Sequence, residues 1–374
     1  MLRAWALRPN AHYSAASPLF LFFASAASPS PPLPPSPPSS LASPFPNRRA
    51  MSRPLRIAVV GDVHDQWDLE QDSRALEFLQ ADLVLFTGDF GNENVELVRS
   101  ISNLKLPKAV ILGNHDSWTT QTFSEKKTNR VCLQLECLGE EHVGYSCLDF
   151  PTLKLCVLGG RPFSIGGDKL FRPRLLSSSL FRYGVNNMEE SAKKICKAAR
   201  GIPEGHCVII LAHNGPTGLG SNADDICGID WIYGGGDHGD PDLARAISDL
   251  QRDEQIPIPL VVFGHMHNTL RYGNGLRKMI VVASDNTIYL NGAIVPRVKD
   301  SLLADPGSST EGLTDPRGSA EGHNQLQTSG VSTLRAFTVV EMLDGEVEKI
   351  AETWVLVSDS NVEIGQETLL FQKQ

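Results

Sequence analysis

The stretch "AVILGNHDSW" at Ala109–Trp118 runs from four apolar residues through one glycine directly into three strongly polar side chains. A short run that is apolar on both faces is typical of a strand buried inside a sheet. A glycine at the exit of such a strand permits a sharp turn, because it lacks a Cβ. The stretch therefore predicts a buried strand with a polar site at its carboxyl end.

Four further segments repeat this pattern of an apolar run followed by Asp, Asn or His side chains. They are "RIAVVGDVH" (56–64), "DLVLFTGDF" (82–90), "CVIILAHNG" (207–215) and "PLVVFGHMH" (259–267). Helix-like stretches at 68–80 and 93–101 separate the early segments, and amphipathic stretches at 187–200 and 240–253 precede the last two. This alternation predicts a parallel sheet, and ligands bind beyond the carboxyl ends of parallel strands. We therefore expect the polar clusters to converge on one site.

The last third of the chain has the pattern of antiparallel strands. We expect these strands at 279–284, 287–292 and 336–357, the last with a hairpin turn at Asp344-Gly345. Residues 299–333 are rich in Gly, Ser, Asp and Glu, which predicts a disordered surface insert. Dividing the chain into two would separate the polar clusters, so we expect one domain over residues 53–374.

Two of the polar clusters have the spacing of a chelate. Asp62 and His64 are two residues apart, as are His265 and His267. In extended chain, residues two apart point to the same face. Each pair can therefore present two side chains to the same site, which is the spacing of chelating residues.

The motifs "GDVH", "GDF", "GNHD", "AHNG" and "GHMH", in this order, resemble the signature blocks of the calcineurin-like metallophosphoesterase superfamily. The resemblance implies an α/β fold, a two-sheet sandwich whose mixed sheets are flanked by helices. The N-terminal leader and the block "GGDHGDPDL" (235–243) resemble a branch of this superfamily that cyanobacteria and plants share.

The resemblance further implies a centre of two divalent metal ions. One ion is held by Asp62, His64, Asp89 and His267, and Asp89 bridges to a second ion that is also held by Asn114, His213 and His265. Nitrogen and oxygen ligands without a thiolate favour Mn, Fe or Zn over Ca or Mg.

The activity implied is hydrolysis of a phosphomonoester or phosphodiester by attack of a metal-bound hydroxide. The resemblance implies that His115 protonates the leaving oxygen or steadies the transition state. Asp116 either orients His115 or caps the following turn. Asp237 and His238 lie in a glycine-rich segment before an expected helix, and we expect them to support the site or contact substrate. His206 is expected at the surface or the edge of the core.

The substrate is constrained by departures from better-known relatives. "GDFGNEN" (88–94) lacks the Asp-Arg-Gly of phosphoprotein phosphatases, and Asp116 replaces their Glu. No tyrosine closely follows Asp89, which argues against a purple acid phosphatase. The positive charge of two divalent ions exceeds the negative charge of their ligands, so the centre attracts an anion. A small phosphorylated or nucleotide-like substrate is therefore favoured.

Composition limits the other partners. The formal net charge of −9 gives no basic field, so strong nucleic-acid binding is not expected, although a nuclease remains an alternative. No apolar stretch approaches the roughly 20 residues of a membrane span. The alternative from another class is a non-catalytic metal-binding scaffold of the same fold.

Residues 1–50 differ in composition from the rest of the chain. They contain arginines but no Asp or Glu, and 27–46 consists mostly of Ser, Pro and small residues. This composition predicts a disordered plastid transit peptide with cleavage near Met51. The alternative is a secretory signal built on "LFLFFASAA" (19–27). Seven scattered cysteines and the absence of an N-x-[ST] acceptor favour the organelle.

Overall fold

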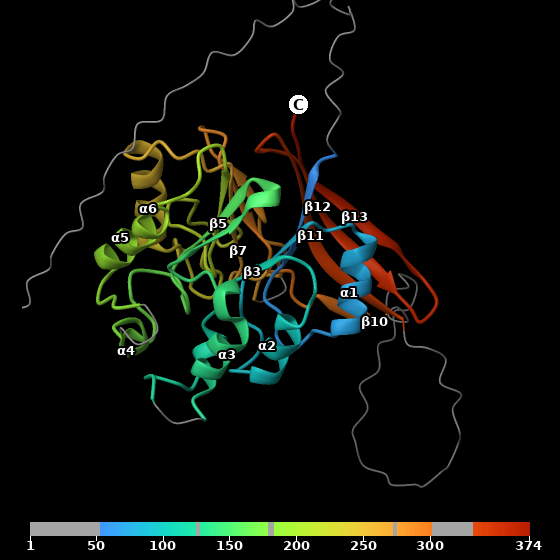
Figure 1. Cartoon of the computed structure of the whole chain (residues 1–374), viewed down its shortest axis with the longest axis horizontal. Coiled ribbons are helices and arrows are strands. Elements are labelled where there is room, and N and C mark those ends of the chain that lie inside the picture. Colours follow the sequence, from blue (N-terminus) through green and yellow to red (C-terminus); the bar gives the residue numbers. More distant parts are fainter. Residues whose placement is uncertain (1–52, 125–127, 179–182, 272–274, 301–331) are drawn as a thin grey trace, which may run out of the picture. The chain divides into compact units, whose positions relative to one another are not determined.

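The computed structural model describes residues 53–124, 128–178, 183–271, 275–300 and 332–374 (Figure 1). The predicted transit peptide, residues 1–50, lies outside the described residues, as does most of the insert expected at 299–333. Within that expected range, Lys299 and Asp300 belong to one strand, and Thr333 begins another.

The first sheet joins the beginning and the end of the described chain. Its order is β13-β12-β11-β1-β2-β3, and β10 pairs with β11. The parallel strands are β1 (Leu55–Val60), β2 (Leu83–Phe86) and β3 (Lys108–Val110). The antiparallel strands are β10 (Val298–Asp300), β11 (Thr333–Leu343), β12 (Glu346–Val357) and β13 (Val362–Gln372). The turn between β11 and β12 is at Asp344 and Gly345, which both have positive φ, so the predicted hairpin is confirmed.

The second sheet has the order β4-β5-β6-β7-β9-β8. Four strands are parallel: β5 (Leu155–Gly159), β6 (Cys207–Leu211), β7 (Leu260–Phe263) and β9 (Ile288–Asn291). The two edge strands, β4 (Cys147–Phe150) and β8 (Ile280–Val282), run antiparallel to their neighbours. The expectation of only antiparallel strands after residue 279 is therefore wrong for β9. The turn after β8 reverses the chain, so β9 re-enters the sheet in the direction of β7.

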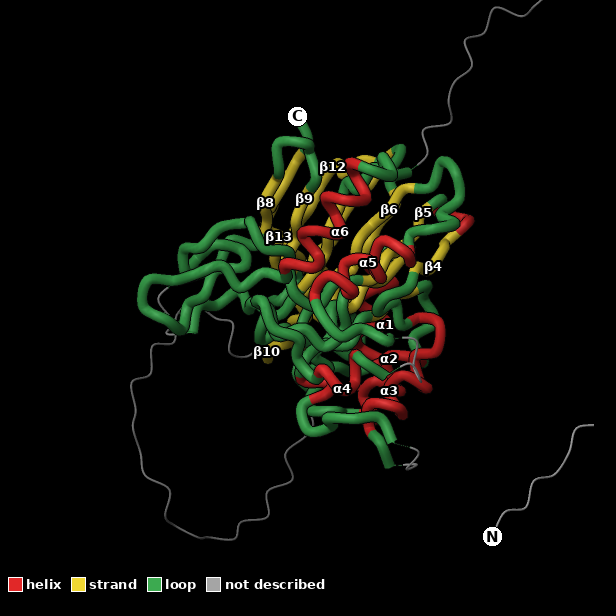
Figure 2. The backbone as a smooth tube through the Cα atoms, turned by 90° about the vertical axis from the view of Figure 1, so that its left-hand side faces the viewer, coloured by secondary structure: helices red, strands yellow, loops and turns green. Residues whose placement is uncertain are grey.

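Helices flank both sheets. They are α1 (Leu69–Phe78), α2 (Val95–Ser102), α3 (Arg130–Leu138), α4 (Pro173–Leu176), α5 (Met188–Ala198) and α6 (Pro241–Arg252). Asp68, Asn94, Asn129 and Asn187 begin four of them, because each side chain accepts a hydrogen bond from a backbone N–H of the first turn. Figure 2 shows α5 and α6 lying together beside the strands of the second sheet. Among the described residues, no helix is both long and apolar enough to cross a membrane.

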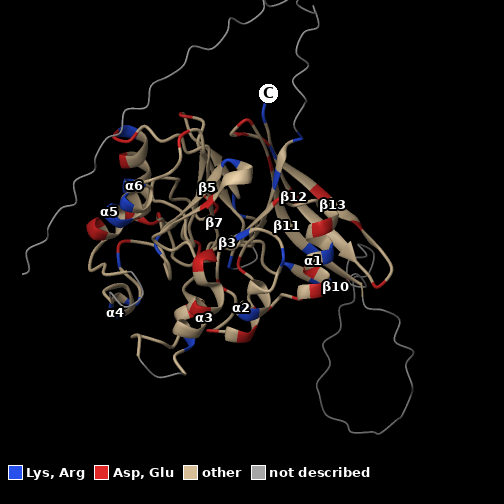
Figure 3. Cartoon of the chain, viewed as in Figure 1, with Lys and Arg blue, Asp and Glu red and all other residues tan. Residues whose placement is uncertain are grey.

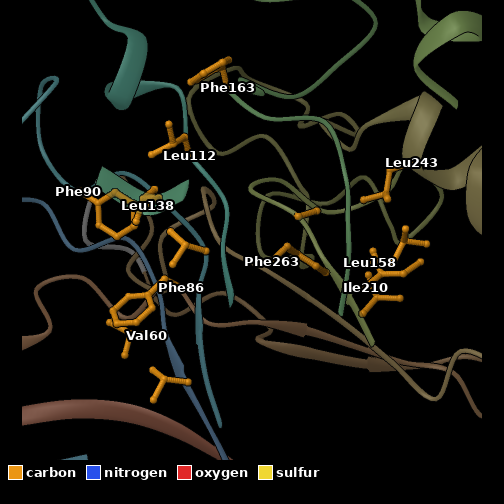
Figure 4. Close-up of a cluster of buried hydrophobic side chains, with 14 of the residues drawn as sticks. Val60, Phe86, Phe90, Leu112, Leu138, Leu158, Phe163, Ile210, Leu243 and Phe263 are labelled. Atoms are coloured by element: carbon orange, nitrogen blue, oxygen red, sulfur yellow. The ribbon is translucent and has the colours of Figure 1, made fainter. Parts of the chain in front are cut away.

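The core has two layers, because alternate strand residues point to opposite faces. In β1, Ile57 and Val59 pack in a cluster that contains residues of both sheets, whereas Ala58 and Val60 pack in a cluster that contains helix residues. Figure 4 shows part of this second cluster. The predicted fold class, two mixed sheets flanked by helices, is confirmed.

All five polar segments follow the carboxyl ends of parallel strands. Three of them follow β1, β2 and β3 of the first sheet, and two follow β6 and β7 of the second. The fold therefore gathers side chains from both sheets at one edge of the sandwich.

Candidate metal centre

The structure brings together the seven side chains that the sequence predicts as metal ligands. They are Asp62, His64, His267, Asp89, His213, His265 and Asn114. Their carboxylate and imidazole donors form two groups, Asp62 with His64 and His267, and Asp89 with His213 and His265, and a third group of His64, Asp89 and His115 links the two. Asp89 therefore lies near donors of both groups, which is the position that a bridging carboxylate needs.

The first group is built on Asp62, which is almost completely buried. The Nε2 atoms of His64 and His267 lie 3.0 Å apart, and Nε2 of His267 lies 3.4 Å from Oδ2 of Asp62. Asp62 also accepts hydrogen bonds from the backbone N–H of His265. Burial alone raises the pKa of Asp62, but the hydrogen bond to His267 and the charges of nearby histidines outweigh burial and lower it.

The second group is built on His213. Its Nε2 lies 3.0 Å from Oδ1 of Asn114 and 3.4 Å from Oδ1 of Asp89. The ring of His265 lies 5.1 Å from that of His213, centroid to centroid. Burial lowers the pKa of His265 to about 3, and the charge of His213 adds to this effect. His265 is therefore neutral and has a lone pair for a metal ion.

The donor set of His213 fits a cation. Its Nδ1 lies 2.7 Å from the carbonyl oxygen of Thr87, and because a carbonyl only accepts, Nδ1 carries a proton. In the neutral ring, Nε2 therefore presents a lone pair to two further acceptors, the oxygens of Asn114 and Asp89. Without a metal ion a proton must occupy this point: burial lowers the pKa of His213, but the charges of Asp89 and Asp62 prevail and raise it to about 10.

The backbone at the site is strained to hold these side chains. His64, Asp89 and His265 have φ values of 42°, 50° and 67°, in the left-handed region that non-glycine residues rarely adopt. Two glycines allow the close approach of the chain. A Cβ at Gly113 would lie 2.3 Å from Oδ1 of Asp89, and one at Gly264 would lie 2.2 Å from Oδ1 of Asp62.

His115 lies beside the two groups, at the border between buried and exposed residues. Its Nδ1 is 2.7 Å from Oδ1 of Asn92. One face of its ring stacks on Trp118, with 4.7 Å between centroids and 9° between planes. Its backbone N–H donates to Oδ1 of Asp89. These contacts fix both the position and the orientation of the imidazole.

Comparison with known families agrees with this arrangement. A sequence model described as calcineurin-like phosphoesterase matches residues 55–269, which include all the residues of the site. The chain belongs to the calcineurin-like phosphoesterase family. Members of this family depend on two metal ions, and the residues clustered here fit such a centre.

Solved structures include similar chains of low sequence identity. A dimetal phosphatase from Danio rerio is 9% identical, with 86% of this chain and 100% of that chain covered and a TM-score of 0.38. A predicted phosphoesterase from Streptococcus pneumoniae is 11% identical, with 87% and 100% covered and a TM-score of 0.30. A search of curated proteins found no match.

Asp116 does not have either of the roles expected for it. Its carboxylate is fully buried and accepts hydrogen bonds from three backbone N–H groups, those of Asp89, Phe90 and Gly113. The partner of the His115 ring is Asn92 instead. Because the three donors come from two loops, Asp116 ties the loop after β2 to the loop after β3. It thereby positions Asp89 and Asn114.

The glycine-rich segment around Asp237 and His238 approaches the candidate metal centre through His238. The ring of His238 stacks on that of His265, with 6.0 Å between centroids, and meets Trp231 edge-on. The carboxylate of Asp237 accepts hydrogen bonds from Thr217, Gly218 and Gly239. Asp237 therefore holds the loop, whereas His238 supports a predicted ligand.

Three residues at the centre were not predicted from the sequence. Thr87 accepts from His213 through its carbonyl and donates to Asp62 through its hydroxyl, so it links the two groups. Asn92 and Trp118 hold the ring of His115. Asn92 and Trp118 lie close to motif residues in the sequence. A polar and an aromatic side chain at these positions could have indicated contacts with the site. The role of the Thr87 carbonyl could not be predicted from the sequence, because every residue has a backbone carbonyl.

Proposed function

We propose that the protein is a phosphoesterase that depends on two divalent metal ions and hydrolyses a phosphomonoester or phosphodiester of a small or nucleotide-like molecule. The observation that supports this most strongly is the arrangement around His213. The side-chain oxygens of Asn114 and Asp89 lie 3.0 Å and 3.4 Å from Nε2 of His213, so a cation, either a proton or a metal ion, fits between these three atoms.

The proposed centre assigns six of the seven side chains to one ion each. Asp62, His64 and His267 would hold the first ion, Asn114, His213 and His265 would hold the second, and Asp89 would serve both. Imidazole, carboxylate and amide ligands favour Mn, Fe or Zn. When bound, such ions act as Lewis acids toward phosphoryl oxygens and lower the pKa of water.

His115 is the proposed general acid. The side-chain oxygen of Asn92 accepts from Nδ1, so in the doubly protonated ring Nε2 is the nitrogen that can donate its proton to the leaving oxygen of the ester. Stacking on Trp118 keeps the ring from rotating away. The side chain of Trp118 is itself exposed, so it borders the place where a leaving group would lie.

The distribution of charge supports a small substrate. Figure 3 shows Lys and Arg interspersed with Asp and Glu on the helices, and the visible described residues form no continuous basic stripe. A long polyanion gains its affinity from many basic contacts. A compact phosphate ester needs only the local charge of the centre.

Metal reconstitution tests this proposal. The full chain is stripped of metal, reloaded with Mn²⁺, Fe²⁺ or Zn²⁺, and assayed on matched phosphomonoesters and phosphodiesters, including activated aryl esters. We expect hydrolysis only when both metal positions of the centre are filled. Metal binding without hydrolysis of any ester would instead support the non-catalytic scaffold.

We also propose that residues 1–50 direct the protein to plastids, and that it belongs to the branch of the family that cyanobacteria and plants share. The composition of the leader and the "GGDHGDPDL" block support both statements.

A further inference from the structure

A second cluster of metal-ligating side chains lies at the other end of the second sheet. Asp149 on β4 is directly opposite Cys156 on β5, and His206 immediately precedes β6, the parallel neighbour of β5. His206 and His213 flank the same strand, so at about 3.3 Å per residue the two sites are separated by roughly 23 Å. The cluster is therefore distinct from the phosphoesterase centre.

The three donor atoms converge on one point. Oδ1 of Asp149 lies 3.3 Å from Sγ of Cys156 and 2.8 Å from Nδ1 of His206. Sγ and Nδ1 lie 3.8 Å apart. Metal–ligand bonds of about 2.0 to 2.3 Å at tetrahedral angles separate neighbouring donors by about 3.3 to 3.6 Å. The triangle needs adjustments of about half an ångström or less to hold a zinc ion.

The same geometry argues against a catalytic Cys-His-Asp triad. In a triad the acid and the nucleophile contact opposite nitrogens of the imidazole, so that a proton can pass through the ring. Here both Asp149 and Cys156 contact Nδ1 of His206. Cys156 is also buried, and burial together with the hydrogen bond to Asp149 raises the pKa of its thiol. A neutral, buried thiol is a poor nucleophile.

We propose that Asp149, Cys156 and His206 bind a zinc ion that is separate from the two ions of the phosphoesterase centre. One sulfur, one nitrogen and one oxygen donor form a mixed set that suits Zn²⁺. The side chain of Asp149 is 37% exposed, so solvent can supply the fourth ligand. As the S–Zn bond forms, the thiol proton leaves to solvent.

The ion would stabilise the β4 edge of the second sheet. β4 is the outermost strand beside β5, and its short ladder is its main connection to the sheet. A metal ion that joins β4, β5 and the segment before β6 would hold this edge in place. The site is thus structural in its effect, and hydrolysis by the distant centre does not require it.

Cobalt substitution distinguishes the two kinds of site, because the proposed phosphoesterase ligands include no sulfur. The reduced, metal-free full chain is titrated with Co²⁺, and the near-ultraviolet thiolate-to-cobalt band is recorded. Reducing buffer keeps Cys156 and the adjacent Cys147 as thiols. We expect the band in the wild-type chain and in Asp89→Asn. We expect its loss, with one equivalent less of bound metal, in Cys156→Ser and in His206→Gln.

Cys207→Ser is the matched control. Cys207 directly follows His206, but its thiol points away from the cluster to the carbonyl of Gly345, so this variant should keep the band. Far-ultraviolet circular dichroism checks that each variant is folded. If Cys156→Ser does not fold, His206→Gln still tests the site, because it changes a partly exposed side chain. A wild-type chain without the band, or a band that survives both Cys156→Ser and His206→Gln, would overturn the proposal.

Discussion

Nδ1 of His115 lies 2.7 Å from the side-chain oxygen of Asn92, which follows the proposed ligand Asp89 by three residues in the loop after β2. Although His115 lies within reach of His64 and Asp89, we assign it to protonation and not to metal binding, because Asn92 holds its Nδ1 and its backbone N–H is bonded to Asp89. Binding of metal and protonation of the leaving group are therefore assigned to different side chains, and substitution can separate them.

Substitution His115→Ala should leave the bound metal unchanged and lower kcat. A positioned general acid contributes about 10²- to 10⁴-fold, so we expect a loss of that order for esters with poor leaving groups. An activated aryl ester should lose less, because its leaving group needs little protonation. Metal stoichiometry and kcat on both kinds of ester are measured on the same preparation. A loss of metal equal to that of His265→Ala would identify His115 as a ligand instead.

Substitution Asn92→Ala should lower kcat less than His115→Ala does, because it frees the ring without removing it. The double variant should be no worse than His115→Ala alone, since Asn92 is proposed to act only through that ring. The four kcat values form a double-mutant cycle. Additive losses would show that Asn92 acts on the substrate by itself.

Asp116 should be important for stability. Asp116→Ala leaves three buried backbone donors unpaired, each of which costs roughly 1–3 kcal/mol, so the free energy of unfolding should fall by about 3 kcal/mol or more. Asp116→Asn should be milder: burial and the charge of Asp89 raise the pKa of Asp116, and an amide resembles the protonated acid. Urea unfolding of the metal-free variants measures both. Equal losses would contradict the role given to the three bonds.

Metal affinity should increase with pH. Below a pKa of about 10, His213 carries a proton on Nε2 in the metal-free protein, and a metal ion must displace that proton. Each displaced proton weakens binding up to about tenfold per unit of falling pH. His265, with a pKa of about 3, is neutral and adds no such dependence near neutral pH. Calorimetric titration with Mn²⁺ over a range around neutral pH checks this, and an affinity independent of pH would contradict it.

The leader can be tested without the enzyme. A fusion of residues 1–50 to a fluorescent reporter should be imported into isolated plastids and cleaved near Met51. Import makes the reporter resistant to added protease, which distinguishes it from surface binding. Delivery to the secretory pathway would favour the alternative signal and would weaken the inference drawn from the cysteines.

The proposed ligands could be predicted because each of them directly follows an apolar run. Parallel strands bring their carboxyl ends to one edge, so a local pattern was enough to expect Asp62, Asp89 and His213 in one place. The role of Asp116 could not be predicted in this way. Its three donors come from two loops, and their approach depends on the packing of β2 against β3.

Relationships that depend on sheet register were also missed. The direction of β9 depends on the turn after β8, which the composition of the strand does not reveal. Asp149 and His206 are 57 residues apart along the chain. Only the order β4-β5-β6 brings them together, so no spacing motif predicts the second cluster.

The central claim is that a pair of metal ions held by these side chains is required for hydrolysis. Asp89→Asn and His265→Ala each remove a proposed ligand, and His206→Gln, far from the centre, is the control. Bound metal is measured by elemental analysis together with hydrolysis of an aryl phosphate ester. We expect both ligand variants to lose metal from the centre and all detectable hydrolysis, while His206→Gln keeps its activity. Full occupancy of the centre with unchanged turnover in either ligand variant would contradict the account.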